Sequence, residues 1–380
     1  MPHVNDKLLF TPGPLTTSKA VKAAMLHDLG SRDTAFSDIV LSIRRDLVKL
    51  AASQNTEAYS AIPVQGSGTF AIESVIGSVI SRTDELLVII NGAYGRRMLQ
   101  IAEVLGIKTH MLTYPEYDIP DTTQIENYLQ THPEVTVVGT VHCETTTGIL
   151  NPIPAIGHIC ATHDCIYIVD AMSSFGAIPL DMDSARIHYL ISSANKCIEG
   201  VPGFGFVIAR TDHLASRKDT ARSLSLDLYN QWKVLEATGQ FRFTPPVQVI
   251  LAFRQAIDEL LAEGGISDRG RRYAKNNRII REGMIQLGFR PYLSEVHQSN
   301  IITTFHYPDF PEFEFDRFYQ QLSNLGMVIY PGKLTDAPCF RIGNIGRLTE
   351  DDIYALLSNI KQVLKKMRGT AHETETENNQ

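Results

Sequence analysis

Residues 166–209 read IYIVDAMSSFGAIPLDMDSARIHYLISSANKCIEGVPGFGFVIA. Three short runs in this stretch are apolar or nearly so, namely Ile166–Val169, Tyr189–Ser192 and Phe204–Ala209. Runs of this length and composition are typical of strands that are buried on both faces of a parallel sheet. The stretch therefore predicts three strands of an α/β domain, with polar segments at their ends.

The same alternation extends toward the N-terminus. Four more extended runs are found at Tyr59–Val64, Leu86–Ile90, Lys108–Leu112 and Thr136–Val141. Helical patterns fill most of the gaps, at Phe70–Ile80, Tyr94–Leu105, Thr122–Gln130 and Ile153–His163. Strands and helices in alternation indicate a sheet with helices on both faces. We therefore predict an α/β domain built on a seven-stranded, mainly parallel sheet.

The pattern changes toward the C-terminus. There we expect helices at Val247–Ala262, Asp268–Gln286, Phe315–Leu325 and Glu350–Met367, and strands at Asn300–Phe305, Val328–Tyr330 and Cys339–Ile342. Such a mixture is typical of an α+β lobe. We predict a large domain over residues 18–250 and a small α+β domain formed by residues 1–17 and 251–368. The polar, acidic tail of residues 369–380 is predicted to be disordered.

The composition argues against several classes of protein. Of the 380 residues, 43% are hydrophobic and 20% are charged, which is typical of a soluble globular protein. The net charge of −7, without a basic run, argues against binding to nucleic acid or to an anionic membrane. No uncharged apolar run is long enough for a transmembrane helix. The five cysteines include no C-x-x-C pair, so we expect no disulfide framework, no metal and a cytoplasmic location.

The segment Val64–Ala71 reads VQGSGTFA and links an expected strand to an expected helix. Its glycines allow the backbone to approach an anion, and the first N–H groups of the helix would point toward that anion. Ser67 and Thr69 can add hydroxyl donors. The segment also fits G-x-G-x-x-A, a weak dinucleotide fingerprint, with Asp84 and Glu85 at a suitable distance beyond it. A tight strand-to-helix turn, an anion cup and a nicotinamide-dependent dehydrogenase are all compatible with this segment.

Two charged residues follow apolar strands further along the chain. Asp170 stands at the carboxyl end of its strand, the edge where ligands bind in open α/β sheets, although a helix N-cap would also explain it. Lys196 stands between an apolar strand and the glycine-rich turn Gly200–Gly205. A lysine amine can form a Schiff base when its pKa is lowered.

Together these segments match the parts that hold pyridoxal 5'-phosphate: a phosphate cup, a partner for the ring nitrogen and a lysine. Asp170 would keep the pyridine nitrogen protonated. Lys196 would hold the aldehyde and later move a proton. A dehydrogenase has no use for an Asp–Lys pair, so this combination weakens that alternative.

The chain resembles the fold-type I pyridoxal-phosphate aminotransferases of class V, in the branch shared with alanine–glyoxylate and serine–pyruvate aminotransferases. The resemblance runs from Leu8 to Leu364 and rests on TPGPLTTS, VQGSGTF, NGAYGRRM, CETTTGILNP, DAMSSFG, SSANKCIEGVPGFGF, ARSLSLDLY, GQFRFTPP and FRIGNIG. It implies pyridoxal 5'-phosphate as the cofactor. It also implies a homodimer with the active site at the subunit interface.

The resemblance carries roles over to single residues. The cofactor would be held by Ser67, Gly68, Thr69, Tyr94, Thr145, Asp170, Lys196 and Thr244. Among these, Tyr94 would stack on the cofactor ring, since a flat aromatic face suits a pyridine. Thr145 would hydrogen-bond on the side of the phenolic oxygen. Thr244 would reach the phosphate from the second subunit.

The resemblance also implies the substrates. Arg341 would bind the substrate anion, because a guanidinium offers parallel N–H donors to a carboxylate or phosphonate. Arg32 is a second candidate cation, since a phosphonate carries more charge than a carboxylate. The likeness is greater to members that act on aminophosphonates, which implies transfer from 2-aminoethylphosphonate to pyruvate, giving phosphonoacetaldehyde and L-alanine in phosphonate degradation. Alanine–glyoxylate or serine–pyruvate transamination is the alternative.

Overall fold

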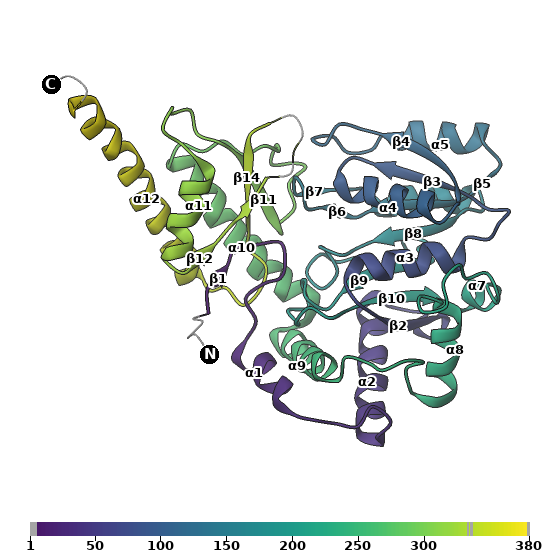
Figure 1. Cartoon of the computed structure of the whole chain (residues 1–380). Coiled ribbons are helices and arrows are strands. Elements are labelled where there is room, and N and C mark those ends of the chain that lie inside the picture. The colour runs from purple at the N-terminus through teal and green to yellow at the C-terminus, as the bar shows by residue number, and fades with distance from the viewer. Residues whose placement is uncertain (1–5, 333, 335–336, 378–380) are drawn as a thin grey trace.

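The computed structural model of the chain describes residues 6–332, 334 and 337–377. Figure 1 shows an α/β part built around a large sheet and a C-terminal lobe, with α10 running from the lobe toward the sheet. Both ends of the described chain contribute to the lobe, because β1 (Leu8–Leu9) pairs in parallel with β12 (Met327–Val328). None of the described helices is both long enough and apolar enough to span a bilayer.

The large sheet has seven strands in the order β2-β10-β9-β8-β5-β3-β4. The strands are β2 (Tyr59–Gln65), β3 (Glu85–Ile90), β4 (Lys108–Thr113), β5 (Val135–Val141), β8 (Ile166–Asp170), β9 (Tyr189–Ser193) and β10 (Phe204–Arg210). All neighbours pair in parallel except β10, which is antiparallel to both β2 and β9. The predicted seven-stranded, mainly parallel sheet is confirmed.

The reversal of β10 follows from its connection to β9. Residues 194–203 join these two strands without a helix. A parallel crossover needs a longer connection, usually with a helix, so the chain returns in the opposite direction. Because β2 is antiparallel to β10, the carboxyl ends of β2, β8 and β9 lie at the same edge of the sheet.

The helices around the sheet bury its strands, except for the edge strand β4, in which Lys108, Met111 and Thr113 are exposed. These helices are α1 (Lys19–Ala23), α2 (Thr34–Ala51), α3 (Gly68–Val79), α4 (Ala93–Val104), α5 (Thr122–Thr131), α6 (Ile153–Thr162), α7 (Thr211–Ala215), α8 (Leu228–Thr238) and α9 (Val247–Glu263). The short 3-10 helices η1 (Ala24–Leu26) and η2 (Thr56–Ala58) and the hairpin of β6 (Cys143–Glu144) and β7 (Ile149–Leu150) complete this part. The sequence analysis did not predict α8, which begins after the N-cap Asp227.

The C-terminal lobe has its own small sheet and its own core. Its antiparallel sheet has the order β11 (Ile302–His306), β14 (Cys339–Gly343) and β13 (Tyr330–Pro331). Its helices are α10 (Gly265–Gln286), α11 (Phe315–Asn324) and α12 (Glu350–Glu377). Phe10 packs in this core, together with residues from α10 onward.

Two predicted boundaries differ from what the packing shows. The buried side chains of α9, from Ile250 to Leu260, pack in the core of the sheet domain, so the change of core comes after residue 260 and not at 250. The backbone of α12 is helical as far as Glu377, through most of the tail expected to be disordered, because each added residue extends a helix that already exists. Residues 378–380 lie outside the described residues.

Candidate active site

The strand-end acid Asp170 lies at the carboxyl edge of the large sheet, where β8 pairs with β9 and Asp170 stands opposite Ile191. Its side chain is 1% exposed, and its Oδ1 accepts a hydrogen bond of 2.8 Å from the Met172 N–H. Burial raises the pKa of this carboxyl to about 6, while the Met172 N–H, Lys196 and Arg97 oppose the shift. A buried carboxylate of this kind needs a positively charged partner.

Lys196 lies in the turn that follows β9, and its amine is held against the N-terminal segment of the chain. Its Nζ donates a hydrogen bond of 2.7 Å to the Pro12 carbonyl oxygen. Burial lowers the pKa of this amine, although Asp170 partly opposes that effect. Gly13, at φ +111, lies so close that a Cβ there would come within 2.8 Å of Lys196 Nζ. The TPGP segment thus covers the amine and limits the space around it.

The predicted anion cup lies at the beginning of α3. Ser67 is the N-cap residue of this helix, and its side chain makes no capping hydrogen bond. Gly68 approaches Met172 so closely that a Cβ at this position would come within 2.3 Å of its sulfur. Thr69 Oγ1 accepts a hydrogen bond of 3.3 Å from Arg97 Nη1. The free N–H groups of a helix N-terminus and two hydroxyls suit a phosphate.

The topology argues against a dinucleotide at this turn. The Gly66–Ala71 segment follows β2, which is an edge strand separated from β3 by four other strands. A dinucleotide fingerprint belongs to a βαβ unit whose parallel strands are neighbours. The glycine-rich turn is therefore not part of such a unit.

Tyr94 begins α4 and is held there by a buried acid that the sequence analysis did not single out. Glu144 is fully buried and accepts hydrogen bonds from the N–H groups of Gly95 (2.8 Å) and Tyr94 (3.2 Å). Burial raises the pKa of Glu144 to about 7, and these two N–H donors oppose the shift. The Arg97 guanidinium lies 4.9 Å from the centroid of the Tyr94 ring. The motif CETTTGILNP contains Glu144, but an acid inside a loop motif does not reveal which helix it will cap.

Arg341 comes from β14 of the C-terminal lobe and is fully buried. Its Nε donates to the Pro331 carbonyl (2.9 Å), and its Nη1 donates to the Thr145 carbonyl (2.7 Å). Its Nη2 has no hydrogen-bond partner among the described residues. Burial lowers the pKa of this guanidinium, and Tyr94 acts in the opposite direction. An unpartnered donor on a buried cation suits an anionic group of a substrate.

Thr244 and Arg32 lie at the surface, where the Thr244 carbonyl oxygen accepts a hydrogen bond of 2.6 Å from Gln65 Nε2, two residues before Ser67. Both are exposed, and both line a surface cavity of about 330 Å³ together with Gln240, Phe241 and other residues. Within the described residues, neither side chain has a recorded hydrogen bond or ion pair with Lys196 or Asp170. The other predicted site residues, which lie in or next to the buried cluster described above, are Ser67, Gly68, Thr69, Tyr94, Thr145, Asp170, Lys196 and Arg341.

Comparison with known proteins identifies the family. The model of the family described as "Aminotransferase class-V" matches residues 16–338. The chain belongs to the class-V aminotransferases. Lys196 offers an amine of the kind that such chemistry uses as a nucleophile, and Asp170 offers a carboxylate that can hold a proton on a ring nitrogen.

Individual relatives of this class-V aminotransferase resemble it in sequence or structure along almost the whole chain. The 2-aminoethylphosphonate–pyruvate transaminase of Klebsiella pneumoniae is 51% identical, covering 94% of this chain and 97% of its own. The protein of the same name from Lysinibacillus sphaericus is 48% identical, covering 95% and 98%. Among solved structures, the ureidoglycine–glyoxylate aminotransferase of Bacillus subtilis has a TM-score of 0.88 at 25% identity, covering 96% and 95%. The alanine–glyoxylate aminotransferase of Nostoc sp. has a TM-score of 0.89 at 23% identity, covering 96% and 97%, and it shares the fold.

Class-V aminotransferases imply pyridoxal phosphate, and the residues present fit this cofactor. Asp170 offers a buried carboxylate, and Lys196 offers an amine whose pKa is lowered by burial. The N-terminus of α3 has an uncapped first turn beside Gly68, where a side chain would collide with Met172. The carboxylate, the amine and the helix N-terminus therefore match the protonated ring nitrogen, the aldehyde and the phosphate of this cofactor.

The raised pKa of Glu144 generates a prediction about stability. Its folded pKa of about 7 lies above the usual 4.5, so the folded state favours the protonated acid. The stabilising contribution is fully present below pH 4.5 and is lost as the pH rises through 7. We expect the stability of the wild type relative to Glu144→Gln to fall by about 3 kcal/mol between pH 4.5 and 7.5.

Urea unfolding of the apoprotein at a series of pH values measures this difference. Glu57→Gln, which removes an exposed carboxylate of η2, is the matched control. A difference between wild type and Glu144→Gln that does not change with pH would show that Glu144 does not titrate in this range.

Proposed function

We propose that the protein transfers the amino group of 2-aminoethylphosphonate to pyruvate, giving phosphonoacetaldehyde and L-alanine in phosphonate degradation. The observation that carries this proposal is the 51% identity to a transaminase of that name over 94% of this chain and 97% of the relative. The buried Arg341, whose Nη2 has no partner in the part of the chain that the structure describes, supports an acidic substrate. The same cation would meet the phosphonate of the donor and the carboxylate of the acceptor in turn.

The cofactor would be pyridoxal 5'-phosphate, with its phosphate on Ser67, Gly68 and Thr69. The chemistry that it supplies when bound is withdrawal of electrons from the carbon that carries the amino group. Asp170 would hold the proton of the pyridine nitrogen through a charge-assisted hydrogen bond. Tyr94 would lie against the ring and Thr145 beside its phenolic oxygen.

Lys196 would act as the base and acid at the reacting carbon. Because burial lowers its pKa, a larger fraction of this amine is neutral than of an exposed lysine, and the neutral amine can accept a proton at Nζ. Asp170 and Arg341 act on this amine in opposite directions, the acid stabilising its charged form and the guanidinium its neutral form. The N-terminal segment around Pro12 and Gly13 covers the amine and would help to exclude water.

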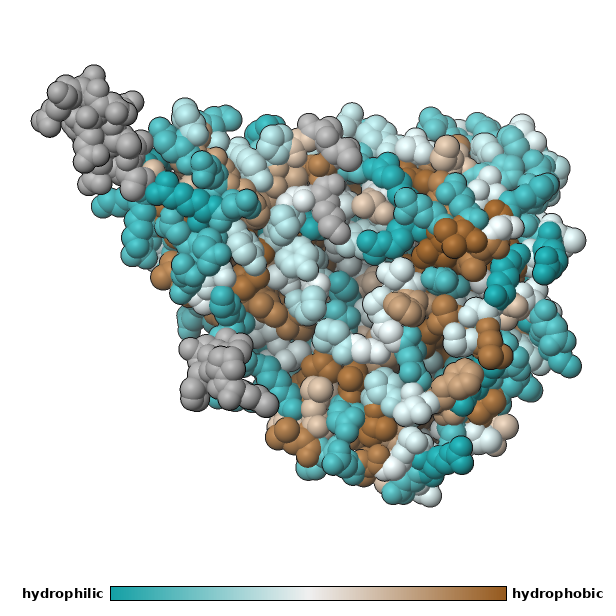
Figure 2. Space-filling model, in the orientation of Figure 1, coloured by the Kyte–Doolittle hydropathy of each residue, from teal (hydrophilic) through white to brown (hydrophobic). Residues whose placement is uncertain are grey.

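The proposal includes a homodimer in which Thr244 and Arg32 serve the site of the other subunit. Both residues are exposed and line one cavity, as expected for residues that a partner covers. Large hydrophobic side chains nearby are exposed as well, among them Phe70 and Phe243, which line a second cavity of about 350 Å³. On the face seen in Figure 2, hydrophobic side chains reach the surface in several places over the half that holds the large sheet. Contiguous exposed apolar surface favours association.

The cytoplasmic location remains part of the proposal. It is supported by the five cysteines, all of which are buried and free. Disulfides are rare in reducing compartments, so this pattern is typical of proteins that function there.

An amino-donor assay tests the function. With pyruvate as the acceptor, we expect L-alanine to form from 2-aminoethylphosphonate at a kcat/KM at least about 100-fold above that with L-serine, because one buried cation and its neighbours discriminate charge and shape. Lys196→Ala is the matched control and should show no turnover. Equal or greater turnover with glyoxylate and a carboxylate donor would support the alanine–glyoxylate alternative instead.

Substitution of Arg341 tests how the substrate anion is bound. Arg341→Lys keeps the charge but loses the planar two-point contact and the hydrogen bonds to Thr145 and Pro331. Loss of a partner for a buried anion costs about 2–5 kcal/mol, so kcat/KM should fall roughly 30-fold to several-thousand-fold. Cofactor absorbance should change little.

Single-turnover kinetics of each half-reaction give the measurement. Both half-reactions should slow, because the phosphonate and the carboxylate occupy the same place in turn. A donor half-reaction at the wild-type rate would mean that another cation holds the phosphonate, and Arg32 would then be the candidate to test.

Mixed subunits test the shared site. Lys196→Ala and Thr244→Glu should each be inactive as a pure protein, the second because a carboxylate would repel the cofactor phosphate. In a mixed dimer, one of the two sites would combine an intact Lys196 with an intact Thr244. Random mixing should therefore restore about a quarter of the wild-type activity. No recovery in a mixture shown by mass spectrometry to contain mixed dimers would exclude a role for Thr244 in the partner's site.

A further inference from the structure

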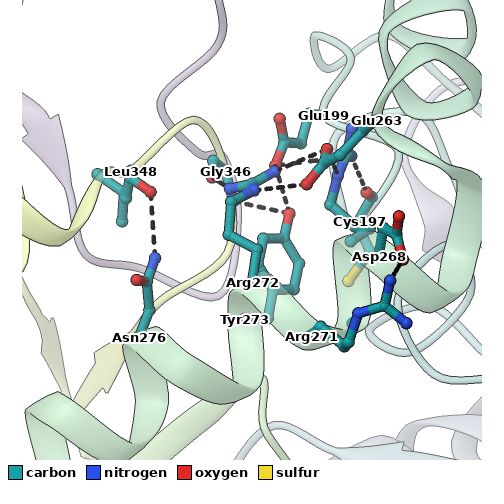
Figure 3. A network of polar contacts seen from close by, with 12 residues as sticks. Cys197, Glu199, Glu263, Asp268, Arg271, Arg272, Tyr273, Asn276, Gly346 and Leu348 are labelled. Carbon is teal, nitrogen blue, oxygen red and sulfur yellow. Dashed lines mark hydrogen bonds and ion pairs between the residues drawn. The ribbon is translucent and has the colours of Figure 1, made fainter.

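A buried network of charges joins the turn that carries Lys196 to α10 (Figure 3). Glu199 lies three residues after Lys196 and is 1% exposed. Its Oε1 accepts hydrogen bonds from the Tyr273 hydroxyl (2.6 Å) and from Arg272 Nη2 (2.7 Å). None of the chemical steps described above uses this acid.

The backbone of the turn depends on the same acid. Glu199 has φ +67, in the left-handed region that residues with a side chain seldom adopt. Its N–H donates to the Lys196 carbonyl oxygen (2.7 Å) and closes the turn. A conformation of this kind persists only where the surroundings hold it, and the contacts of the carboxylate with α10 provide that hold.

The network continues from α10 to the strand that carries Arg341. The Tyr273 hydroxyl accepts a hydrogen bond from the Gly346 N–H (2.9 Å), and Arg272 Nη1 donates to the Gly346 carbonyl oxygen (2.8 Å). Gly346 follows β14 closely, since that strand ends at Gly343. A single phenol oxygen therefore bridges the turn after Lys196 and the loop after the Arg341 strand.

The network is balanced in charge, which allows it to be buried. Glu263 at the end of α9 accepts from Arg269 Nε (2.6 Å) and from Arg272 Nε (2.7 Å). Arg269 also donates through Nη1 to the Cys197 carbonyl oxygen (2.7 Å). Two acids thus face two arginines, and buried charges that are paired and hydrogen-bonded form a rigid arrangement.

We infer that Glu199 and Tyr273 are positioning residues whose hydrogen bond sets the place of Lys196 relative to Arg341. The inference rests on the proposed function, in which the amino end of a substrate meets Lys196 and the anionic end meets Arg341. Lys196 is carried by the sheet domain and Arg341 by the C-terminal lobe, and these two parts have separate hydrophobic cores. The spacing between Lys196 and Arg341 therefore needs a link across the seam where the two cores meet. Tyr273 and Cys197 pack in the small apolar cluster that lies at this seam.

Tyr273→Phe is the central variant, because it removes the bridging oxygen and keeps the ring that fills the seam. We expect kcat/KM for the amino donor to fall about tenfold, through both a higher KM and a lower kcat, as for loss of a buried hydrogen bond to a charged group. In the apoprotein, the amine of Lys196 should become better solvated, so its pKa should rise toward the usual value. Competitive labelling with acetic anhydride across a pH series, read by mass spectrometry, measures that pKa.

Two controls separate positioning from general destabilisation. Arg271→Gln removes an exposed ion pair with Asp268 on the same helix (Figure 3) and should leave the pKa of Lys196 and both kinetic constants unchanged. Leu356→Ala, in the core of the C-terminal lobe, should lower the melting temperature without changing the labelling of Lys196. A Tyr273→Phe protein with wild-type labelling and wild-type kcat and KM would overturn the inference.

Glu199→Gln provides a second, independent variant. It keeps an acceptor for Tyr273 but leaves two arginines facing one carboxylate, and it should shift the pKa of Lys196 in the same direction. If it does not fold, Tyr273→Phe alone decides the outcome. The labelling uses no phosphonate, so a wild type inactive toward 2-aminoethylphosphonate would refute the proposed function, whereas an unchanged Lys196 pKa in Tyr273→Phe would refute the positioning role.

Discussion

The parallel pairing of β8 with β9 is the constraint on which the site depends. It brings the end of one buried strand, Asp170, beside the strand that leads to Lys196. Burial raises the pKa of the acid and lowers that of the amine, because it disfavours the charged form of each group. The nearby opposite charge stabilises the charged form of each. Opposite charges in a low-dielectric site interact far more strongly than they would in water. The cup at α3 is placed by the same sheet edge, because β2 runs in the same direction as β9.

The second condition is that two separate cores must meet at a defined distance. Arg341 belongs to a strand of the C-terminal lobe, while Lys196 belongs to the sheet domain. α10 contacts both sides, through Tyr273 and its neighbours on one side and through Asn277, whose amide donates to the Asn344 side chain (3.0 Å), on the other. A hydrogen-bonded network with balanced charge holds such a seam more firmly than apolar packing alone, because hydrogen bonds constrain direction as well as distance.

Much of this arrangement could be predicted from local patterns. Continuous apolar runs predicted most of the seven strands, because a strand covered on both faces has no polar alternation to obscure it. The edge strand β4 was predicted from a mixed polar and apolar run. Asp170 and Lys196 stood out because a charge directly after such a run has to serve a purpose. The antiparallel direction of β10 and the helix α8 were missed. Direction is decided by the connection between strands, and α8 buries only two of its side chains, Leu228 and Leu235.

The sequence by itself determined the class of fold and the family, because these depend on local composition and short motifs. Only the tertiary structure decided that Glu144 holds the start of α4, that Glu199 adopts a left-handed backbone against α10, and that one donor of Arg341 has no partner among residues 6–332, 334 and 337–377. It also placed the backbone of Thr244 against Gln65, beside the turn that leads into α3. Contacts between residues far apart in the sequence leave no periodic signal, since each depends on how complete elements pack and not on their neighbours along the chain.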